Sequence, residues 1–198
     1  MAGVIEFYFD FSSPYGYFAS VQVDDLAAEF GRTVTWKPIM IGAAFKGSGN
    51  SNLIEQPLKG DYSRLDWQHL ARLLNVPWVL PEPFPSDPGG CARLLVAGRA
   101  RRGVGQAIRP GRLPRLFCRG MRYLGGRNGA DVAATLNIDG PALFAAVQDP
   151  AIKERLKRET DAAIHRGVFG SPFVFVDGEG FWGTDRLWMV KRGLERGG

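Results

Sequence analysis

The first forty residues constrain the fold most, because a buried strand runs directly into a helix start. Residues 4–11, VIEFYFDF, are rich in β-branched and aromatic side chains, which is typical of a buried strand. Ser13 is an N-cap residue with Pro14 at the first helical position, and apolar residues then recur at helical spacing as far as Phe30. Residues 33–41 predict a second strand, which a central proline makes irregular or an edge strand. This β-α-β order implies a parallel strand pair.

The rest of the chain adds helices and one hairpin. Residues 42–52 have the glycine, serine and asparagine content of a loop, and a loop of this length often carries function. Helical spacing returns over Tyr62–Leu74, and several helices are predicted within residues 91–165. Asp177-Gly178 is the strongest hairpin signal in the chain, and a short helix is predicted over Thr184–Arg196.

This order of elements predicts an α/β chain with a thioredoxin-like fold and a large all-helical insertion after the second strand. We expect residues 1–45 and 150–198 to form the thioredoxin-like domain and residues 46–149 the helical insertion domain. In that fold the reactive residue sits where the first strand gives way to the first helix, because the amides there stabilise a thiolate. Ser13 is at that place, in Ser-Pro-Tyr-Gly rather than Cys-x-x-Cys, so dithiol exchange is excluded and the thiol must come from elsewhere.

Composition excludes several other classes. The 198 residues are 45% hydrophobic and 23% charged, which is typical of one globular core. No apolar run is long enough for a membrane span, and acidic residues interrupt the first apolar stretch, so we expect no membrane contact and no signal peptide. Cys91 and Cys118 are too few and too far apart for a disulfide framework or a zinc site, so no metal and a cytoplasmic location are expected.

The positive charge is concentrated in one stretch. Ten arginines and no acidic residue lie between Asp87 and Asp131, and because the whole chain carries +5, the remainder carries −5. Arginine-rich segments can follow a nucleic-acid backbone, but this one lacks the aromatic and helical signatures of such proteins. We therefore favour a solvated helical face, or a positive electrostatic field that attracts an anionic substrate, over nucleic acid as a partner.

Three ordered motifs resemble the 2-hydroxychromene-2-carboxylate isomerases and their relatives, the kappa-class glutathione transferases. FYFDFSSPYGY, residues 7–17, is similar to the amino-terminal signature, and KPIMIGAAFKGSGN, residues 37–50, to the second-strand loop. GVFGSPFVFVDGEGFWGTDRL, residues 167–187, resembles the carboxy-terminal signature with its cis-proline. The resemblance runs through essentially the whole chain. It departs at Gly16, where serine is commoner, and at Ser171-Pro172-Phe173, where Val-Pro-Thr is commoner.

The resemblance implies glutathione as cofactor, with Ser13 as the catalytic residue that hydrogen-bonds its sulfur and lowers the thiol pKa. It implies a cis Pro172 that leaves the Ser171 backbone free to pair with the cysteinyl unit. The glutathione-binding residues that it implies are Ser13, Pro14, Tyr15, Asn50, Lys59, Ser171, Pro172, Trp182, Gly183, Thr184 and Asp185. For the substrate it implies Lys46, Asn52 and Phe84.

Each of these residues also has a structural interpretation. Ser13 could be only an N-cap, Pro172 a trans proline opening an edge strand, and Thr184 or Asp185 a helix cap. A lysine in a loop, such as Lys46, is more often solvated surface, although a carboxylate substrate needs a cation.

The function implied by the resemblance is a glutathione-dependent isomerase that interconverts 2-hydroxychromene-2-carboxylate and trans-o-hydroxybenzylidenepyruvate, in aromatic hydrocarbon catabolism. Its partner would be a small aromatic carboxylate, and a homodimer is an open option. Two alternatives remain. A kappa-class-like transferase would keep the glutathione in its product, whereas a non-catalytic thioredoxin-fold module would bind peptides or nucleic acid through the arginine stretch.

Overall fold

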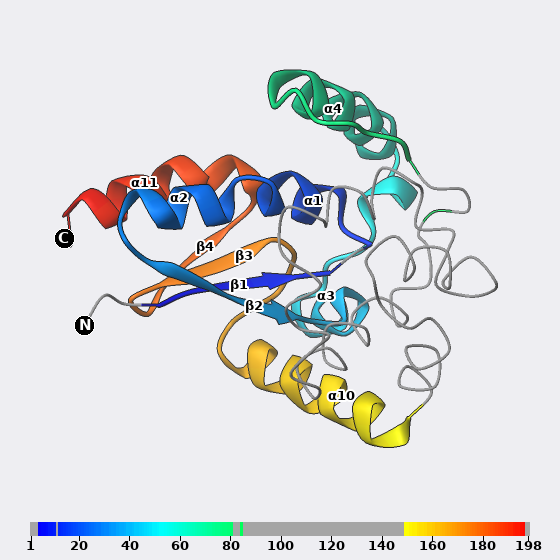
Figure 1. Cartoon of the computed structure of the whole chain (residues 1–198). Coiled ribbons are helices and arrows are strands. Elements are labelled where there is room, and N and C mark those ends of the chain that lie inside the picture. The colour runs from blue at the N-terminus through cyan, green and yellow to red at the C-terminus, as the bar shows by residue number, and fades with distance from the viewer. Residues whose placement is uncertain (1–3, 11, 81–83, 85–148, 197–198) are drawn as a thin grey trace.

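A four-stranded mixed sheet forms the centre of the molecule (Figure 1). The computed structural model describes residues 4–10, 12–80, 84 and 149–196. The strand order is β2-β1-β3-β4, in which β1 runs parallel to β2 and antiparallel to β3, and β3 runs antiparallel to β4. The strands are β1 (Val4–Phe9), β2 (Thr33–Pro38), β3 (Phe173–Val176) and β4 (Glu179–Trp182). The predicted parallel pair and the predicted thioredoxin-like fold are confirmed.

The hairpin between β3 and β4 turns where the sequence predicts it. Asp177 and Gly178 have φ angles of 52° and 92°, and such positive values at both central residues suit the right-handed twist of a hairpin.

Helices cover both faces of the sheet (Figure 1). One face carries α1 (Pro14–Ser20), α2 (Val23–Glu29) and α11 (Leu187–Arg196), and the other carries α3 (Ile41–Ser48) and α10 (Pro150–His165). Helix α4 (Lys59–Leu73) lies beyond the sheet (Figure 1). Two short 3₁₀ turns complete the described elements: η1 (Leu53–Glu55) before α4, and η3 (Thr184–Arg186) between β4 and α11. None of the described helices is long and apolar enough to cross a bilayer.

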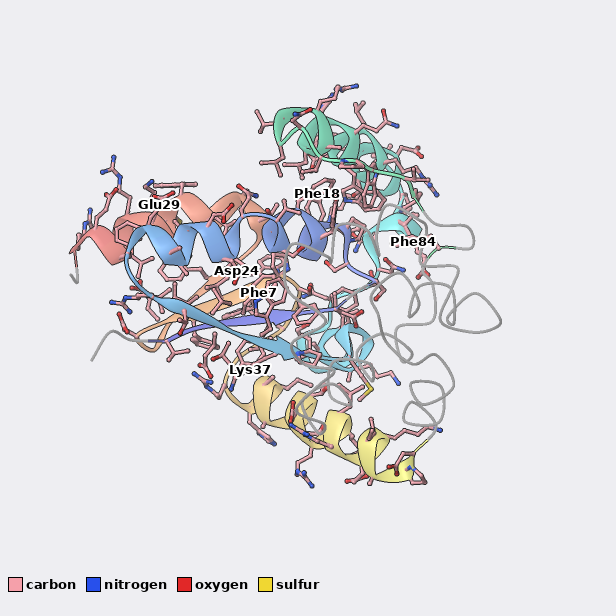
Figure 2. All side chains as sticks on the ribbon, viewed as in Figure 1. Phe7, Phe18, Asp24, Glu29, Lys37 and Phe84 are labelled. Atoms are coloured by element: carbon pink, nitrogen blue, oxygen red, sulfur yellow. The ribbon has the colours of Figure 1, made fainter. Side chains whose placement is uncertain are left out.

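Each face of the sheet has its own apolar core. Phe7 and Phe18 are fully buried between the sheet and the α1–α2 layer, where Figure 2 labels them. Tyr8, Phe173 and Ala163 belong to the smaller cluster beneath α10. The alternation of Phe7 and Tyr8 along β1 therefore serves two cores, which explains why the opening strand is apolar at almost every position.

Two sequence expectations about helices are wrong. The single helix predicted to Phe30 is broken between α1 and α2, because Ser20 Oγ and Gln22 Nε2 donate to the carbonyls of Tyr17 and Phe18, both at 2.7 Å, and so compete with the helical ladder. The loop predicted over residues 42–52 is helical as far as Ser48.

The described part of the predicted insertion is helical over α4 and at the end of α3, whereas residues 76–80 are not. Helix α4 spans Lys59–Leu73, three residues earlier at its start than the periodicity indicates. The last predicted helix begins as η3 and continues as α11 to Arg196. Most of the insertion, including the arginine-rich residues 93–127 and both cysteines, lies outside the described residues, so the division at residues 46–149 stays a prediction.

Glu6 ties β1 to the α10 side of the sheet. Its carboxylate oxygens lie 2.7 Å from Lys37 Nζ and 2.7 Å from Arg166 Nη1. Burial alone raises the pKa of Glu6, but the hydrogen bonds and charges of Lys37 and Arg166 outweigh it, so the pKa lies below its ordinary value. The network therefore stabilises the fold above the unfolded-state pKa, and this stabilisation is lost as pH falls through the folded-state pKa.

We expect Glu6→Gln to lower the free energy of unfolding at neutral pH by up to about 1 kcal/mol, since both cations are partly exposed. The difference in free energy of unfolding between this variant and the unsubstituted protein should disappear in acid, because Glu6 is then protonated in both the folded and the unfolded states. Denaturant titrations across the acid range measure it, and a constant difference at every pH would contradict the assignment.

Candidate active site

A cavity of about 770 Å³ opens where β1 gives way to α1. Segments that are distant in the sequence meet there: the start of α1, helix α3 with the loop after it, helix α4, the segment before β3, and η3. The predicted site residues that line it are Ser13, Pro14, Tyr15, Asn50, Asn52, Lys59, Phe84, Ser171, Pro172, Trp182, Gly183, Thr184 and Asp185. Lys46 is placed apart from them, exposed in the last turn of α3.

Ser13 is 5% exposed and bonds to both neighbouring segments. Its Oγ accepts a hydrogen bond from Gly16 N at 3.1 Å, so it caps α1, and it donates to Ser171 O at 2.8 Å. The Ser171-Pro172 peptide is cis, as predicted. Ser13 is therefore a helix cap and also a direct link to the cis-proline segment, so its hydroxyl and the Ser171 carbonyl share one wall of the cavity.

The two departures from the family pattern are in contact. A Cβ atom built on Gly16 would lie 2.8 Å from Ser171 Oγ, which is too close without a shift. Ser171 Oγ is held in place because it accepts a hydrogen bond from Asp10 N at 3.0 Å. Gly16 therefore leaves room for the side-chain hydroxyl of Ser171.

This contact predicts that substitutions at Gly16 and Ser171 have non-additive effects on stability. Alanine normally stabilises a helix relative to glycine by about 1 kcal/mol, but Gly16→Ala should destabilise this protein because its methyl group meets Ser171 Oγ. In a Ser171→Ala background the same change should cost less. Thermal unfolding of the two single variants and the double variant measures the coupling, and strictly additive effects would count against a direct contact.

Tyr15 connects α1 to α4 across the cavity. Its hydroxyl donates to Asp66 Oδ2 at 2.9 Å, and its ring packs edge-on against Trp67. Burial raises the pKa of Tyr15, and the hydrogen bond to Asp66 and the charge of that carboxylate raise it further. Tyr15 is therefore a neutral hydrogen-bond donor at physiological pH. Asp66 was not expected from the sequence, because only the packing of α4 brings it to Tyr15.

The η3 turn brings charges of both signs to the cavity. Asp185 pairs with Arg186, and both side chains are largely solvent-exposed. Thr184 is buried, and its Oγ1 has no hydrogen-bond partner among the described residues. Arg186 was not singled out from the sequence, although the quoted motif contains it and a cation beside Asp185 could have been noted. The turn thus offers an anion, a cation and an unpaired hydroxyl within three consecutive residues.

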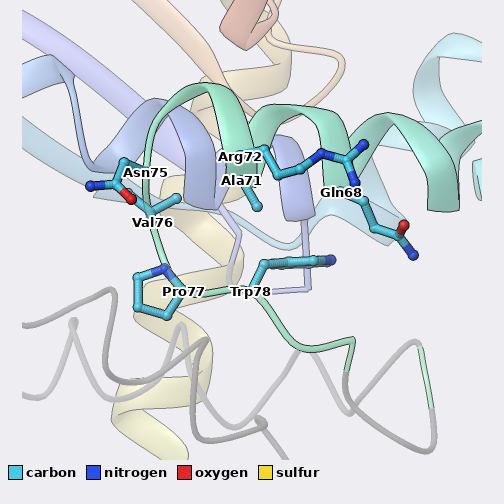
Figure 3. Close-up of a pocket in the computed structure, with 7 residues that line it drawn as sticks. All are labelled: Gln68, Ala71, Arg72, Asn75, Val76, Pro77 and Trp78. Atoms are coloured by element: carbon cyan, nitrogen blue, oxygen red, sulfur yellow. The ribbon is translucent and has the colours of Figure 1, made fainter.

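A second hollow of about 560 Å³ lies at the far end of α4 (Figure 3). Its walls come from α4 and the segment after it: Gln68, Ala71, Arg72, Asn75, Val76, Pro77 and Trp78. None of the candidate residues lies in it. The site is therefore assigned to the larger cavity.

Comparison with known proteins agrees with this geometry. The profile of the DsbA-like thioredoxin domain matches residues 4–195. A 2-hydroxychromene-2-carboxylate isomerase from Sphingobium xenophagum is 33% identical, covering 94% of this chain and 95% of its own. One of the same name from Pseudomonas putida is 30% identical, covering 98% and 95%. The chain belongs to the 2-hydroxychromene-2-carboxylate isomerase family.

The isomerase family assignment holds in three dimensions. A solved 2-hydroxychromene-2-carboxylate isomerase matches with a TM-score of 0.82 and 28% identity, covering 98% of this chain and 95% of that one. The kappa-class relation holds too, since glutathione S-transferase kappa 2 of Caenorhabditis elegans is 26% identical over 94% of this chain and 89% of its own. The disulfide reductase DsbM of Pseudomonas aeruginosa shares the fold, with a TM-score of 0.59 and 16% identity over 98% of this chain and 95% of its own.

Proposed function

We propose that the protein is a glutathione-dependent isomerase that interconverts 2-hydroxychromene-2-carboxylate and trans-o-hydroxybenzylidenepyruvate. One observation carries the proposal: the hydroxyl of Ser13 and the carbonyl of Ser171 share the wall of an aromatic-lined cavity at the reactive position of the fold. A hydroxyl cannot exchange disulfides, so a site built this way needs a thiol from a small molecule. The family relationship supplies the reaction.

The residues present fit glutathione. Ser171 precedes a cis-proline, which is where a thioredoxin-like fold pairs its main chain with an extended peptide such as the cysteinyl unit. The γ-glutamyl end carries an ammonium and a carboxylate, and η3 offers Asp185 for the first and Thr184 for the second. The unpaired Thr184 Oγ1 supports this, because an orphaned buried hydroxyl costs about 1 to 3 kcal/mol until a partner satisfies it. Asn50 and Lys59 line the same cavity.

Ser13 must change its hydrogen bond to do this work. Its proton is directed at Ser171 O, 2.8 Å away, whereas stabilising a thiolate requires the same proton to point at sulfur. An N–H group from the cysteinyl unit can replace Ser13 on the Ser171 carbonyl, so that carbonyl keeps a donor. Meanwhile Gly16 N continues to hold Ser13 Oγ in place. The hydroxyl is thus released for the sulfur without breaking the cap of α1.

The other walls of the cavity suit an aromatic acid. Its aromatic side chains come from five different segments and include Tyr15, Phe45, Trp67, Phe84 and Trp182. Flat rings of this kind pack against an aromatic substrate. Lys59 and Arg186 are the cations among its described lining residues and could attract a carboxylate, and Asn52 adds an amide. Lys46 lies apart in the structure, so its contact with substrate stays a prediction.

When bound, glutathione would supply a thiolate nucleophile for reversible addition to a conjugated carbon, by which a double bond would become a rotatable single bond, and it would be regenerated at the end. The chain provides the surroundings for this chemistry. Ser13 would stabilise the negative charge on the sulfur, and the aromatic walls would exclude water. The neutral Tyr15 hydroxyl, whose one proton is donated to Asp66, presents its oxygen to the same cavity as an acceptor.

A calorimetric titration with glutathione, followed by a spectrophotometric assay with the hydroxychromene acid, tests the proposal. We expect saturable binding of glutathione and isomerisation that does not consume it. Consumption of the thiol would favour the kappa-like transferase. Absence of glutathione binding together with salt-dependent affinity for nucleic acid would favour the non-catalytic module.

A further inference from the structure

Asp10 is a buried polar residue beneath the cavity with several hydrogen bonds. It is fully buried at the end of the opening strand, and its Oδ1 accepts hydrogen bonds from Ser12 N at 2.8 Å and from Ser12 Oγ at 2.7 Å. Its Oδ2 accepts from Ile41 N at 2.8 Å. Both oxygens of this side chain therefore accept hydrogen bonds, two of them from Ser12 and one from the first residue of α3.

The main chain of Asp10 extends the same network. Its N–H donates to Ser171 Oγ at 3.0 Å, and its carbonyl accepts from Ser13 N at 3.0 Å. One residue is therefore bonded to Ser12, Ser13, Ile41 and Ser171. All four line the cavity, whereas Asp10 is not among the lining residues.

The bond to Ile41 also explains why α3 begins where it does. Met40 occupies the N-cap position but its side chain makes no capping hydrogen bond. The backbone amide of Ile41, the first helical residue, donates to the carboxylate of Asp10 instead. Helix α3 carries Ile41, Gly42 and Phe45 on the cavity wall. Asp10 thus links two walls of the cavity. One wall holds Ser13 and Ser171, and the other is helix α3, which would face an aromatic substrate.

We propose that Asp10 is a positioning residue that sets Ser13 and Ser171 in register with the α3 wall, so that the thiol and the aromatic substrate are aligned. This inference rests on the proposed function. Catalysis by orientation is sensitive to small displacements, so loosening this link should affect turnover more than binding of the remote γ-glutamyl end. That end is assigned to Thr184 and Asp185, which none of the Asp10 hydrogen bonds described above reaches.

Asp10→Asn tests the proposal because it keeps the shape and replaces one acceptor with a donor that faces other donors. We expect kcat at saturating substrate to fall about tenfold and the pH midpoint of thiolate formation by bound glutathione, followed by ultraviolet absorbance, to rise by about one unit. Affinity for S-methylglutathione, which has no free thiol, should change by less than about threefold.

Asp24→Asn is the matched control. Asp24 is half-buried on α2, accepts a hydrogen bond from Trp36 at 3.2 Å and does not line the cavity, so kcat and the thiolate midpoint should stay unchanged. If Asp10→Asn fails to fold, Ser12→Ala is the second variant, because it removes one donor to the carboxylate. It should lower kcat and raise the thiolate midpoint by smaller amounts, with affinity for S-methylglutathione again nearly unchanged.

The outcomes are distinct. If the unsubstituted protein bound no glutathione, the proposed function would fail, and this inference with it. If it bound and turned over, but Asp10→Asn and Ser12→Ala lowered only the melting temperature and left kcat and the thiolate midpoint unchanged, the proposed function would stand and Asp10 would be a purely structural residue.

Discussion

Ser13→Ala should keep the fold and lose most of the turnover. The missing hydroxyl leaves the sulfur of bound glutathione without its charge-stabilising donor, so the thiol pKa rises and less thiolate is present at neutral pH. Deleting one hydrogen bond to a charged group corresponds to about 2 to 3 kcal/mol, or roughly 30- to 150-fold in kcat. Steady-state kinetics at saturating glutathione measures it.

The same substitution also removes a structural bond, and the two effects must be separated. Ser13 caps α1 through Gly16 N, and loss of such a cap costs about 1 kcal/mol. Ser20→Ala provides the control, since Ser20 is a buried serine in the same helix that donates to Tyr17 O and lies away from the cavity. It should lower the melting temperature comparably and leave kcat unchanged. Full turnover by Ser13→Ala would refute the catalytic role.

Much of the fold could be predicted because its signals are local. Ser13-Pro14 marks a helix start and Asp177-Gly178 a hairpin through the backbone preferences of those residues alone. Helix α3 could not be predicted, since the group that satisfies its first amide is Asp10, 31 positions earlier in the chain. The break after α1 likewise depends on which carbonyls Ser20 and Gln22 select.

The site residues likewise fall into two groups: those that belong to sequence motifs and those that only the packing of helices brings to the cavity. Ser13, Ser171 and Asp185 belong to contiguous motifs, and the family resemblance of those motifs implied that they lie in one site. Asp66 carries no motif, and its proximity to Tyr15, 51 positions away, follows only from the packing of α4 on α1. Lys46 differs from both, because residues predicted as a loop form a helix whose exposed last turn carries this side chain outside the cavity lining, and its contact with substrate stays a prediction.

Asp185→Asn should weaken glutathione binding while leaving saturated turnover nearly unchanged. Asp185 is the carboxylate of the η3 turn, and in the proposed complex it accepts the α-ammonium of the γ-glutamyl residue. Its ion pair with Arg186 is exposed and contributes little stability, so exchanging that partner for an ammonium group costs little. We expect a loss of about 1 to 3 kcal/mol in binding free energy, measured by calorimetry, with kcat preserved because the lost contact is equally strong in ground and transition states.

Asp177→Asn is the matched control for this experiment. Asp177 is also an exposed aspartate paired with an arginine, Arg32 at 2.7 Å, but it lies in the β3–β4 turn, and asparagine tolerates its φ of 52°. Glutathione affinity should not change in that variant. If Asp185→Asn bound glutathione as tightly as the unsubstituted protein and only its melting temperature fell, Asp185 would serve the turn into α11 and the γ-glutamyl end would have to be held elsewhere. Weaker binding with intact kcat would instead separate the two roles, with Asp185 in binding and Ser13 in chemistry.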